Sequence, residues 1–147
     1  MLGALSKTTG DREGQVASLT NLGYAYSSSG NYAQAIDCYK QALEIIDCYK
    51  QALEIAEKIS FLRVEGTVLG NLGSVFFALG DCKRTIELYK KALDIWRQIR
   101  NKESEALTLD NLGKAYCALR DYEKALEYNQ QHLAIVKAMF QQLRRAS

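Results

Sequence analysis

Proline is absent from this sequence, and histidine and tryptophan occur once each. Because proline is the strongest breaker of a helix interior, a chain without it can be helical nearly throughout. No apolar run approaches the roughly 18 residues that a membrane-spanning helix requires. The N-terminal stretch MLGALSKTTGD lacks the basic start and the sustained apolar segment of a signal peptide. We therefore expect an all-α protein that has no membrane partner.

An excess of charge of one sign is also missing. The chain carries 19 Lys and Arg against 17 Asp and Glu, a net charge of +2, and no basic stripe stands out. This balance argues against a nucleic-acid partner. The single histidine, His132, has no second histidine or nucleophile pair with it, and no nucleotide-binding, metalloprotease or hydrolase motif occurs. We expect no enzyme, no catalytic residue, no metal and no cofactor.

Four cysteines are present, but they do not form a metal or disulfide pattern. Cys38 and Cys48 are copies of one position in a duplicated segment, and Cys82 and Cys117 stand alone. Lone cysteines on helices usually act as small buried apolar residues. This interpretation implies a reducing compartment, so we expect a cytoplasmic protein.

Three segments of the sequence share one pattern. They begin TNLGYAYSSSG at Thr20, GNLGSVFFALG at Gly70 and DNLGKAYCALR at Asp110. Each contains Asn-Leu-Gly, an aromatic residue three positions after that glycine, a turn and a second amphipathic run. The triplets start at residues 21, 71 and 111, so they are 50 and 40 residues apart. Residues 36–45 and 46–55 are identical, and without these ten extra residues both intervals would be 40.

This pattern resembles the tetratricopeptide repeat, in which each unit is a pair of antiparallel helices. The resemblance covers nearly the whole chain, and the 40-residue unit is similar to that of spindle-orientation adaptors and bacterial arrays. It implies an all-α solenoid in a single domain, 1–147, with repeats at 14–59, 62–99 and 102–143. The residues that carry it are Leu19, Leu22, Gly23, Tyr26, Ala35, Tyr39 and Ala42, then Leu69, Leu72, Gly73, Phe76, Thr85, Tyr89 and Ala92, then Leu109, Leu112, Gly113, Tyr116 and Ala125. The third unit departs from the pattern at Asn129 and His132, which replace a tyrosine and an alanine.

Small and turn-forming residues give further local predictions. The three triplet glycines should lie where the helices of a unit cross closely. Gly30 and Gly80 should supply the left-handed residue of the turn, and Arg120 at the third turn predicts strain or a different shape there. Asp81 and Asp121 are expected N-caps of the second helices. Leu19, Leu22 and Tyr26 share one helical face and should point into the core.

Both ends of the chain look like the interior of an array. The segment GALSKTTGD resembles the last turns of a preceding helix, which would make the chain part of a larger solenoid. No polar helix covers the final repeat, and solenoids usually need such a cap. The Tyr, Leu and Met residues of the last helix are therefore a candidate surface for self-association.

The duplication has two possible consequences for the fold. The extra ten residues either loop out, which keeps three repeats in register, or lengthen one helix to about 31–59. Looping out exposes two Ile, a Leu and a Tyr, and buried aliphatic side chains contribute ~1.5–3 kcal/mol each. Since the segment lacks Gly and Pro, we expect the elongated helix.

A longer helix would separate the first two helix pairs. Each copy would then leave an apolar face uncovered, and a second chain could cover both by exchange. We therefore expect a domain-swapped homodimer assembled through residues 36–56. The expected self-association residues are Ile36, Tyr39, Leu43, Ile46, Tyr49 and Leu53.

The resemblance also implies a function, binding of a protein or peptide partner in the concave groove. In similar arrays an asparagine at the triplet position hydrogen-bonds the backbone of an extended peptide, a task that suits an amide because it both donates and accepts. The expected groove residues are Asn21, Tyr24, Asn71, Ser74, Asn111 and Lys114. The alternative is that each asparagine merely bonds a neighbouring helix. A further alternative is an engineered or variant array, made to study folding or assembly, that retains no ligand.

Overall fold

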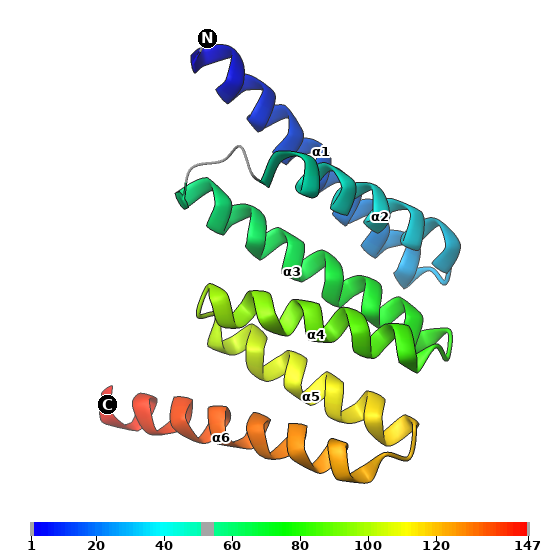
Figure 1. Ribbon diagram of the computed structural model, residues 1–147, viewed down its shortest axis with the longest axis vertical. Helices are drawn as coiled ribbons and strands as arrows, with labels where there is room; N and C mark the ends of the chain where they lie inside the picture. The colour runs from blue at the N-terminus through cyan, green and yellow to red at the C-terminus, as the bar shows by residue number, and fades with distance from the viewer. Residues whose placement is uncertain (1, 51–54, 147) are drawn as a thin grey trace.

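The structure, a computed structural model, describes residues 2–50 and 55–146, with the side chains of 12–48, 50 and 58–146. Over these residues the chain forms six helices and no strand. Consecutive helices run antiparallel and stack as three hairpins (Figure 1). The helices are α1 (Leu2–Ser28), α2 (Tyr32–Tyr49), α3 (Ile55–Ala78), α4 (Cys82–Gln98), α5 (Lys102–Ala118) and α6 (Tyr122–Ala146). The predicted all-α solenoid of about three helix pairs is confirmed.

The triplet glycines let the two helices of each hairpin approach closely, as predicted. A Cβ added to Gly23 would lie 2.6 Å from the Tyr39 ring, and one added to Gly73 would lie 2.7 Å from the Tyr89 ring. In the third hairpin the side chain that fills this place is Asn129, directly against Gly113. The other departure of this unit is accommodated by a hydrogen bond, since His132 Nδ1 donates to the Ala106 carbonyl at 2.8 Å.

The three hairpin turns have the same shape. Gly30 and Gly80 have φ values of 84° and 82°, and Arg120 adopts the same left-handed conformation with φ 62°. The N–H of Arg120 donates to the Cys117 carbonyl at 2.9 Å, as the N–H of Gly80 does to the Phe77 carbonyl at 3.0 Å. The turn at Arg120 is therefore strained, because side chains disfavour this region, but it is not differently shaped.

The predicted N-caps of α4 and α6 are present. The N–H of Arg84 donates to Asp81 at 3.2 Å, and the N–H of Lys124 donates to Asp121 at 3.3 Å. Each carboxylate satisfies one of the backbone donors that the first turn of a helix leaves unpaired.

The predicted elongated helix near 31–59 is wrong. α2 ends at Tyr49, and from Ile55 onward α3 runs back antiparallel along it (Figure 1). With 18 residues α2 is one residue longer than the 17-residue α4, whereas α3 has 24 residues against 17 in α5. The added length of the first repeat therefore appears mostly at the start of α3, although Ile55 is the only described residue of the second copy that lies in that helix. This arrangement keeps α3 on the first copy of the duplicated segment, and that packing outweighs continuation of α2.

The duplicated segment consequently does not leave its apolar residues uncovered. Tyr39 is 1% exposed and Ile46 is 0% exposed, both in a core that also holds Phe61, Val68 and Leu72 of α3. Ile36 and Leu43 are partly buried against the same core. Hairpins one and two are in contact, so the expected separation is wrong and the reason for a swapped dimer through 36–56 is gone. Of the other expected self-association residues, the side chain of Tyr49 and the whole of Leu53 lie outside the described residues.

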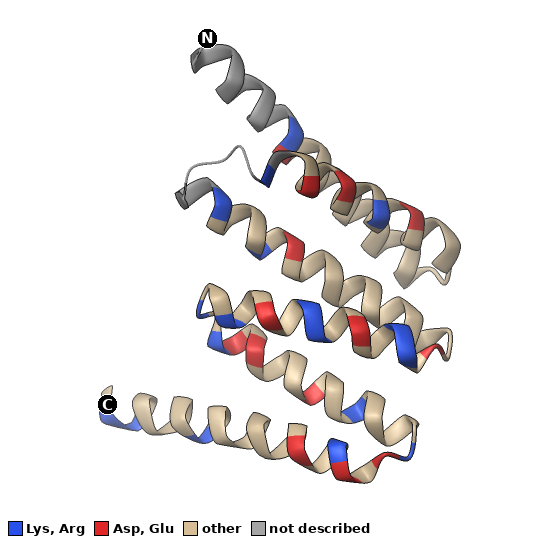
Figure 2. Cartoon of the chain, in the orientation of Figure 1, with Lys and Arg blue, Asp and Glu red and all other residues tan. Residues whose placement is uncertain are grey.

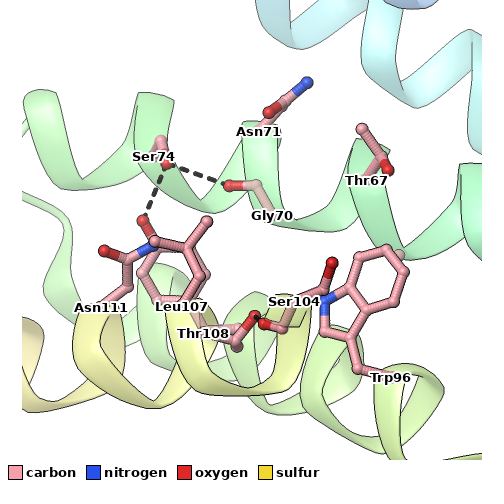
Figure 3. A pocket seen from close by; sticks show the side chains of 11 residues that line it. Thr67, Gly70, Asn71, Ser74, Trp96, Ser104, Leu107, Thr108 and Asn111 are labelled. Atoms are coloured by element: carbon pink, nitrogen blue, oxygen red, sulfur yellow. Dashed lines mark hydrogen bonds between the residues drawn. The ribbon is translucent and has the colours of Figure 1, made fainter. Parts of the chain in front are cut away.

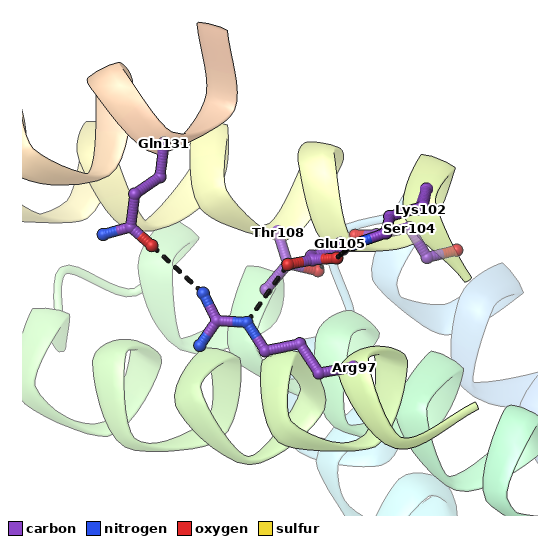
Figure 4. Close-up of polar contacts among 6 residues, drawn as sticks. All are labelled: Arg97, Lys102, Ser104, Glu105, Thr108 and Gln131. Carbon is purple, nitrogen blue, oxygen red and sulfur yellow. Dashed lines mark hydrogen bonds and ion pairs between the residues drawn. The ribbon is translucent and has the colours of Figure 1, made fainter. Parts of the chain in front are cut away.

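Each hairpin is joined to the next by an ion pair as well as by apolar packing. Lys50 Nζ lies 2.9 Å from Glu65 Oε2 between α2 and α3. Forty residues later, Glu105 of α5 occupies the equivalent place, and its Oε2 lies 3.1 Å from Arg97 Nε of α4 (Figure 4). Arg97 also donates to Gln131 of α6 at 3.0 Å, so one guanidinium links three helices.

Three further predictions need correction. The N-terminal segment from Leu2 is part of α1 and not the end of a preceding helix. Leu22 is exposed, unlike its equivalents Leu72 and Leu112, which are buried against the hairpin before them. Cys38 is buried and Cys82 half-buried, but Cys48 and Cys117 are exposed.

None of the described helices is long and apolar enough to cross a membrane.

Candidate functional site

A groove of about 220 Å³ lies between α3 and α5, with α4 as its floor (Figure 3). Its walls come from one face of each of the two outer helices, at the spacing of three and four residues that aligns side chains along a helix. The lining residues are Gly66, Thr67, Gly70, Asn71 and Ser74 of α3, Tyr89 and Trp96 of α4, and Ser104, Leu107, Thr108 and Asn111 of α5.

The floor of the groove depends on a missing side chain. A Cβ added to Gly66 would lie 2.7 Å from the indole ring of Trp96, so glycine at this position lets the ring lie beneath α3. Trp96 itself is buried in a small core with Leu69, Ala92 and Ile95. The aromatic floor is therefore held rigidly from below.

Most hydroxyl groups of the groove are already hydrogen-bonded. Ser74 Oγ lies 3.1 Å from the Gly70 carbonyl oxygen and 2.9 Å from the Tyr89 hydroxyl. Thr108 Oγ1 donates to the Ser104 carbonyl at 2.8 Å. Burial raises the pKa of Tyr89, while the bond to Ser74 and the charge of Lys114 act in the opposite direction. These groups fix the shape of the groove and leave little donor capacity for a ligand.

The two asparagines of the groove are not equivalent. The Asn71 side chain lies beside Tyr39 of α2, a contact that partly offsets the rise that burial causes in the Tyr39 pKa. Figure 3 shows the Asn71 amide pointing away from Thr108 and Asn111. Within the described part of the chain, no hydrogen bond engages the Asn111 side chain. Asn71 thus faces Tyr39 of a neighbouring helix, whereas Asn111 keeps an amide available to a ligand in the groove.

The structure brings together only part of the predicted groove. Asn71, Ser74 and Asn111 line it. Lys114 does not, and its Nζ lies 3.2 Å from Asp110 on the same helix. The predicted residues of the first repeat, Asn21 and Tyr24, are exposed on α1 outside this groove.

Sequence reasoning missed the apolar part of the groove. Thr67 and Leu107 each lie four residues before a triplet asparagine, which places them one turn away on the same helical face. That spacing was the signal that could have found them, since the asparagines were already assigned to the groove. Trp96 gave no such signal, because its position depends on Gly66 of another helix.

The groove carries no formal charge, for no Asp, Glu, Lys or Arg is among the described residues that line it. Figure 2 shows that charged residues of both signs are dispersed along the helices. The described residues also include no group of three or more His, Cys, Asp or Glu side chains that could hold a metal ion. The groove can therefore offer apolar contact, an aromatic floor and one free amide.

Comparisons with known proteins agree with this architecture. A tetratricopeptide repeat model matches residues 64–138, just over half of the chain, and another matches residues 16–45. A search of curated proteins found no match. Among solved structures, the TPR domain of Arabidopsis FLU is similar with a TM-score of 0.68 and 19% identity, over 86% of this chain and 98% of that one. The N-terminal domain of stress-induced protein-1 from C. elegans is similar with a TM-score of 0.63 and 18% identity, over 82% and 83%.

At these identities the structural likeness concerns the fold, whereas the family models rest on the sequence itself. Their two matches together include the three Asn-Leu-Gly triplets and most of the second helix of every hairpin. The chain belongs to the tetratricopeptide repeat family.

Proposed function

We propose that this protein is a noncatalytic scaffold that binds an extended, uncharged segment of a protein partner in the groove between α3 and α5. Tetratricopeptide repeats generally mediate protein–protein interaction. The observation that carries the proposal is the free Asn111 amide beside an aromatic floor in a groove without charge. Binding of this kind requires neither a cofactor nor a metal.

The free amide suits the backbone of an extended peptide. One Asn111 side chain can accept from a peptide N–H and donate to a peptide carbonyl, so it can bond both groups of one residue. Because these groups are common to all sequences, the amide supplies affinity without selecting a side chain. Asn71 does not contribute in the same way, because its amide lies beside Tyr39 and points away from Asn111.

Selectivity would come from Leu107 and Trp96. Leu107 is one of the large apolar residues that remain exposed, and it lines the same groove as the indole ring of Trp96 (Figure 3). An apolar side chain of the peptide would cover Leu107 and contact the ring. Burial of such a side chain stabilises a complex by ~1.5–3 kcal/mol before the costs of association.

The missing charge distinguishes this groove from arrays that hold a terminal carboxylate. Such arrays use clustered lysine and asparagine, and here the one nearby lysine, Lys114, is paired with Asp110. Peptide affinity should therefore change little with salt, because screening acts on charged pairs. A ligand rich in acidic residues would not fit this proposal.

A peptide library displayed on phage tests the proposal. We expect wild-type protein to enrich extended peptides with an apolar residue and few charges. Peptides so selected should bind about tenfold more weakly to N111A and to L107A, a change of about 1.4 kcal/mol. N21A is the matched control, since it removes the same amide from a site outside the groove and should bind like wild type. Enrichment of acidic peptides, or equal binding by N111A, would contradict the proposal.

The same selection tests the competing hypothesis of a variant array without a ligand, which predicts that no peptide is enriched above an unrelated helical protein. A domain-swapped homodimer forms no part of the proposed function, because Tyr39 and Ile46 are covered within one chain. A cytoplasmic location remains a prediction from the cysteine pattern alone.

A further inference from the structure

The outer face of α6 is apolar and uncovered. Its exposed large residues recur at helical spacing, so they form one continuous stripe. No charged residue occurs between Glu127 and Lys137, and Figure 2 shows the middle of α6 without charge. The stripe consists of Leu126, Leu133, Val136, Phe140 and Leu143.

The corresponding face of α4 shows what such a stripe contacts. Leu126 and Leu133 lie 40 residues after Ile86 and Leu93, which occupy the same places in the preceding hairpin. Leu93 is 4% exposed, whereas Leu133 is 50% exposed. Ile86 and Leu93 are buried in a core formed with α5. The α6 stripe therefore corresponds to the surface of α4 that α5 covers.

The face of α5 that covers α4 has an exposed counterpart in α1. In α5 this face consists of Leu112 and Ala115, both fully buried. The equivalents in α1 are Leu22 and Ala25, which follow the same Asn-Leu-Gly register and are exposed. Leu22 is 48% exposed, against 0% for Leu112. At one end of the molecule, α1 therefore has an exposed face equivalent to the one by which α5 covers α4. At the other end, α6 has an exposed face equivalent to the surface of α4 that is covered.

We propose that two copies of this chain stack head to tail, with the Leu22 face of α1 in one copy packed on the Leu133 face of α6 in the next. The register is that of α5 on α4, so the contact continues an interface that already exists within the chain. The two helices, α1 and α6, lie at opposite ends of the stack (Figure 1). Such a contact is heterologous, and each added copy presents a new free face, so assembly proceeds beyond a dimer.

The interface between copies lacks the ion pair of the internal interfaces. The position of Arg97 corresponds to Lys137 in one copy, and the position of Glu105 corresponds to Gln15 in the next copy. The carboxylate of the ion pair is therefore replaced by an uncharged amide. Apolar burial alone then holds the copies together. Association should persist when salt is raised from about 0.1 M to about 0.5 M, since screening weakens charged contacts and not apolar ones.

Sedimentation velocity over a series of concentrations tests the proposal. Wild-type protein should give species at successive multiples of 16.5 kDa as its concentration rises. L22E and L133E should each remain at 16.5 kDa, because each lacks one of the two faces. An equimolar mixture of L22E and L133E should form a dimer and nothing larger, since only one pair of intact faces remains. L79E is the matched control, because Leu79 is 52% exposed in the turn before α4, away from both faces, and should assemble like wild type.

Circular dichroism establishes that each variant is folded, and L126E provides a second variant of the α6 face. A wild-type chain that stays at 16.5 kDa at every concentration overturns the proposal. So does dimerisation of L22E alone, since that outcome means that two α6 faces meet each other. Dissociation by salt also overturns it, because the copies would then meet through charged groups.

Discussion

Glu105 of α5 lies in the interface between the second and third hairpins, with its Oε2 3.1 Å from Arg97 Nε. Its side chain is only 7% exposed, and Lys102 Nζ lies 3.2 Å from its other oxygen. A carboxylate at such a site is costly unless cations and donors surround it. Burial of Glu105 therefore depends on its ion pair with Arg97. The same pair fixes the register of the third hairpin on the second.

Replacement of Arg97 should reveal this dependence. R97M leaves the buried Glu105 carboxylate with Lys102 alone, and we expect the free energy of unfolding to fall by about 1–3 kcal/mol. K114M is the matched control, because it breaks the exposed pair with Asp110 and should cost less than about 0.5 kcal/mol. Urea unfolding followed by circular dichroism measures both. Equal losses in the two variants would mean that burial of Glu105 has no energetic consequence.

Arg120 offers a site where a substitution should stabilise the protein. Its φ of 62° is a conformation that Gly30 and Gly80 adopt without a Cβ penalty. We expect R120G to raise stability by about 0.5–1 kcal/mol, the strain relieved less the extra freedom of glycine in the unfolded chain. G80A should have the opposite effect at the equivalent turn. The thermal unfolding midpoint measures both, and a lower midpoint for R120G would contradict the expectation.

Two glycines of α3 should respond in opposite ways to the same substitution. In G73A the new Cβ would meet the ring of Tyr89, which is buried and cannot move aside, so we expect a loss of about 1–3 kcal/mol. Gly70 has no atom within 4 Å of the added position, so G70A should stabilise α3 by about 0.5–1 kcal/mol through helix propensity. Urea midpoints compare the two. If G70A destabilised as much as G73A, contact with Tyr89 would not be the cause.

These local features were predictable because each depends on residues close together in sequence or on the register of the repeat. The contact of Gly73 with Tyr89 and the turn at Gly80 follow from the position of the Asn-Leu-Gly triplet. The groove was predictable only in part, since Asn71 and Asn111 have the same register but only Asn71 lies beside a tyrosine of the preceding hairpin. Asn71 meets Tyr39 of another hairpin, and no pattern within one repeat indicates that contact.

The duplication was misjudged for a different reason. Helix propensity and amphipathicity are the same in both copies, so the sequence alone gives no reason to end α2 at Tyr49. The helix ends there because Phe61 and Val68 of α3 bury Tyr39 and Ile46 when the chain turns back. Burial in the tertiary structure outweighs local propensity, and pattern reasoning within one segment does not include it.

Stability should decrease in alkaline solution. Burial raises the pKa of Tyr39 and of Tyr89 above the ordinary value of 10.0. Above about pH 10 the unfolded chain releases phenolic protons that the folded chain still holds, so unfolding becomes more favourable as the pH rises through the raised pKa. We expect the urea midpoint to be lower at about pH 11 than at about pH 9, and the difference to be smaller in Y89F. Y122F removes an exposed tyrosine and should leave the fall unchanged. A midpoint independent of pH in wild type would contradict this prediction.

Deletion of residues 46–55 separates the role of the duplication in folding from any role in assembly. The deletion joins Ile45 to Ala56, so alanine takes the place of the fully buried Ile46. We expect the three hairpins to persist with a loss of about 2–4 kcal/mol, close to that of I46A in the full chain. Because the Leu22 and Leu133 faces are untouched, the shortened chain should still sediment in multiples of its own mass. A shortened chain that became strictly monomeric while the full chain assembled would instead place the contact between copies in the duplicated segment, as a swapped dimer requires.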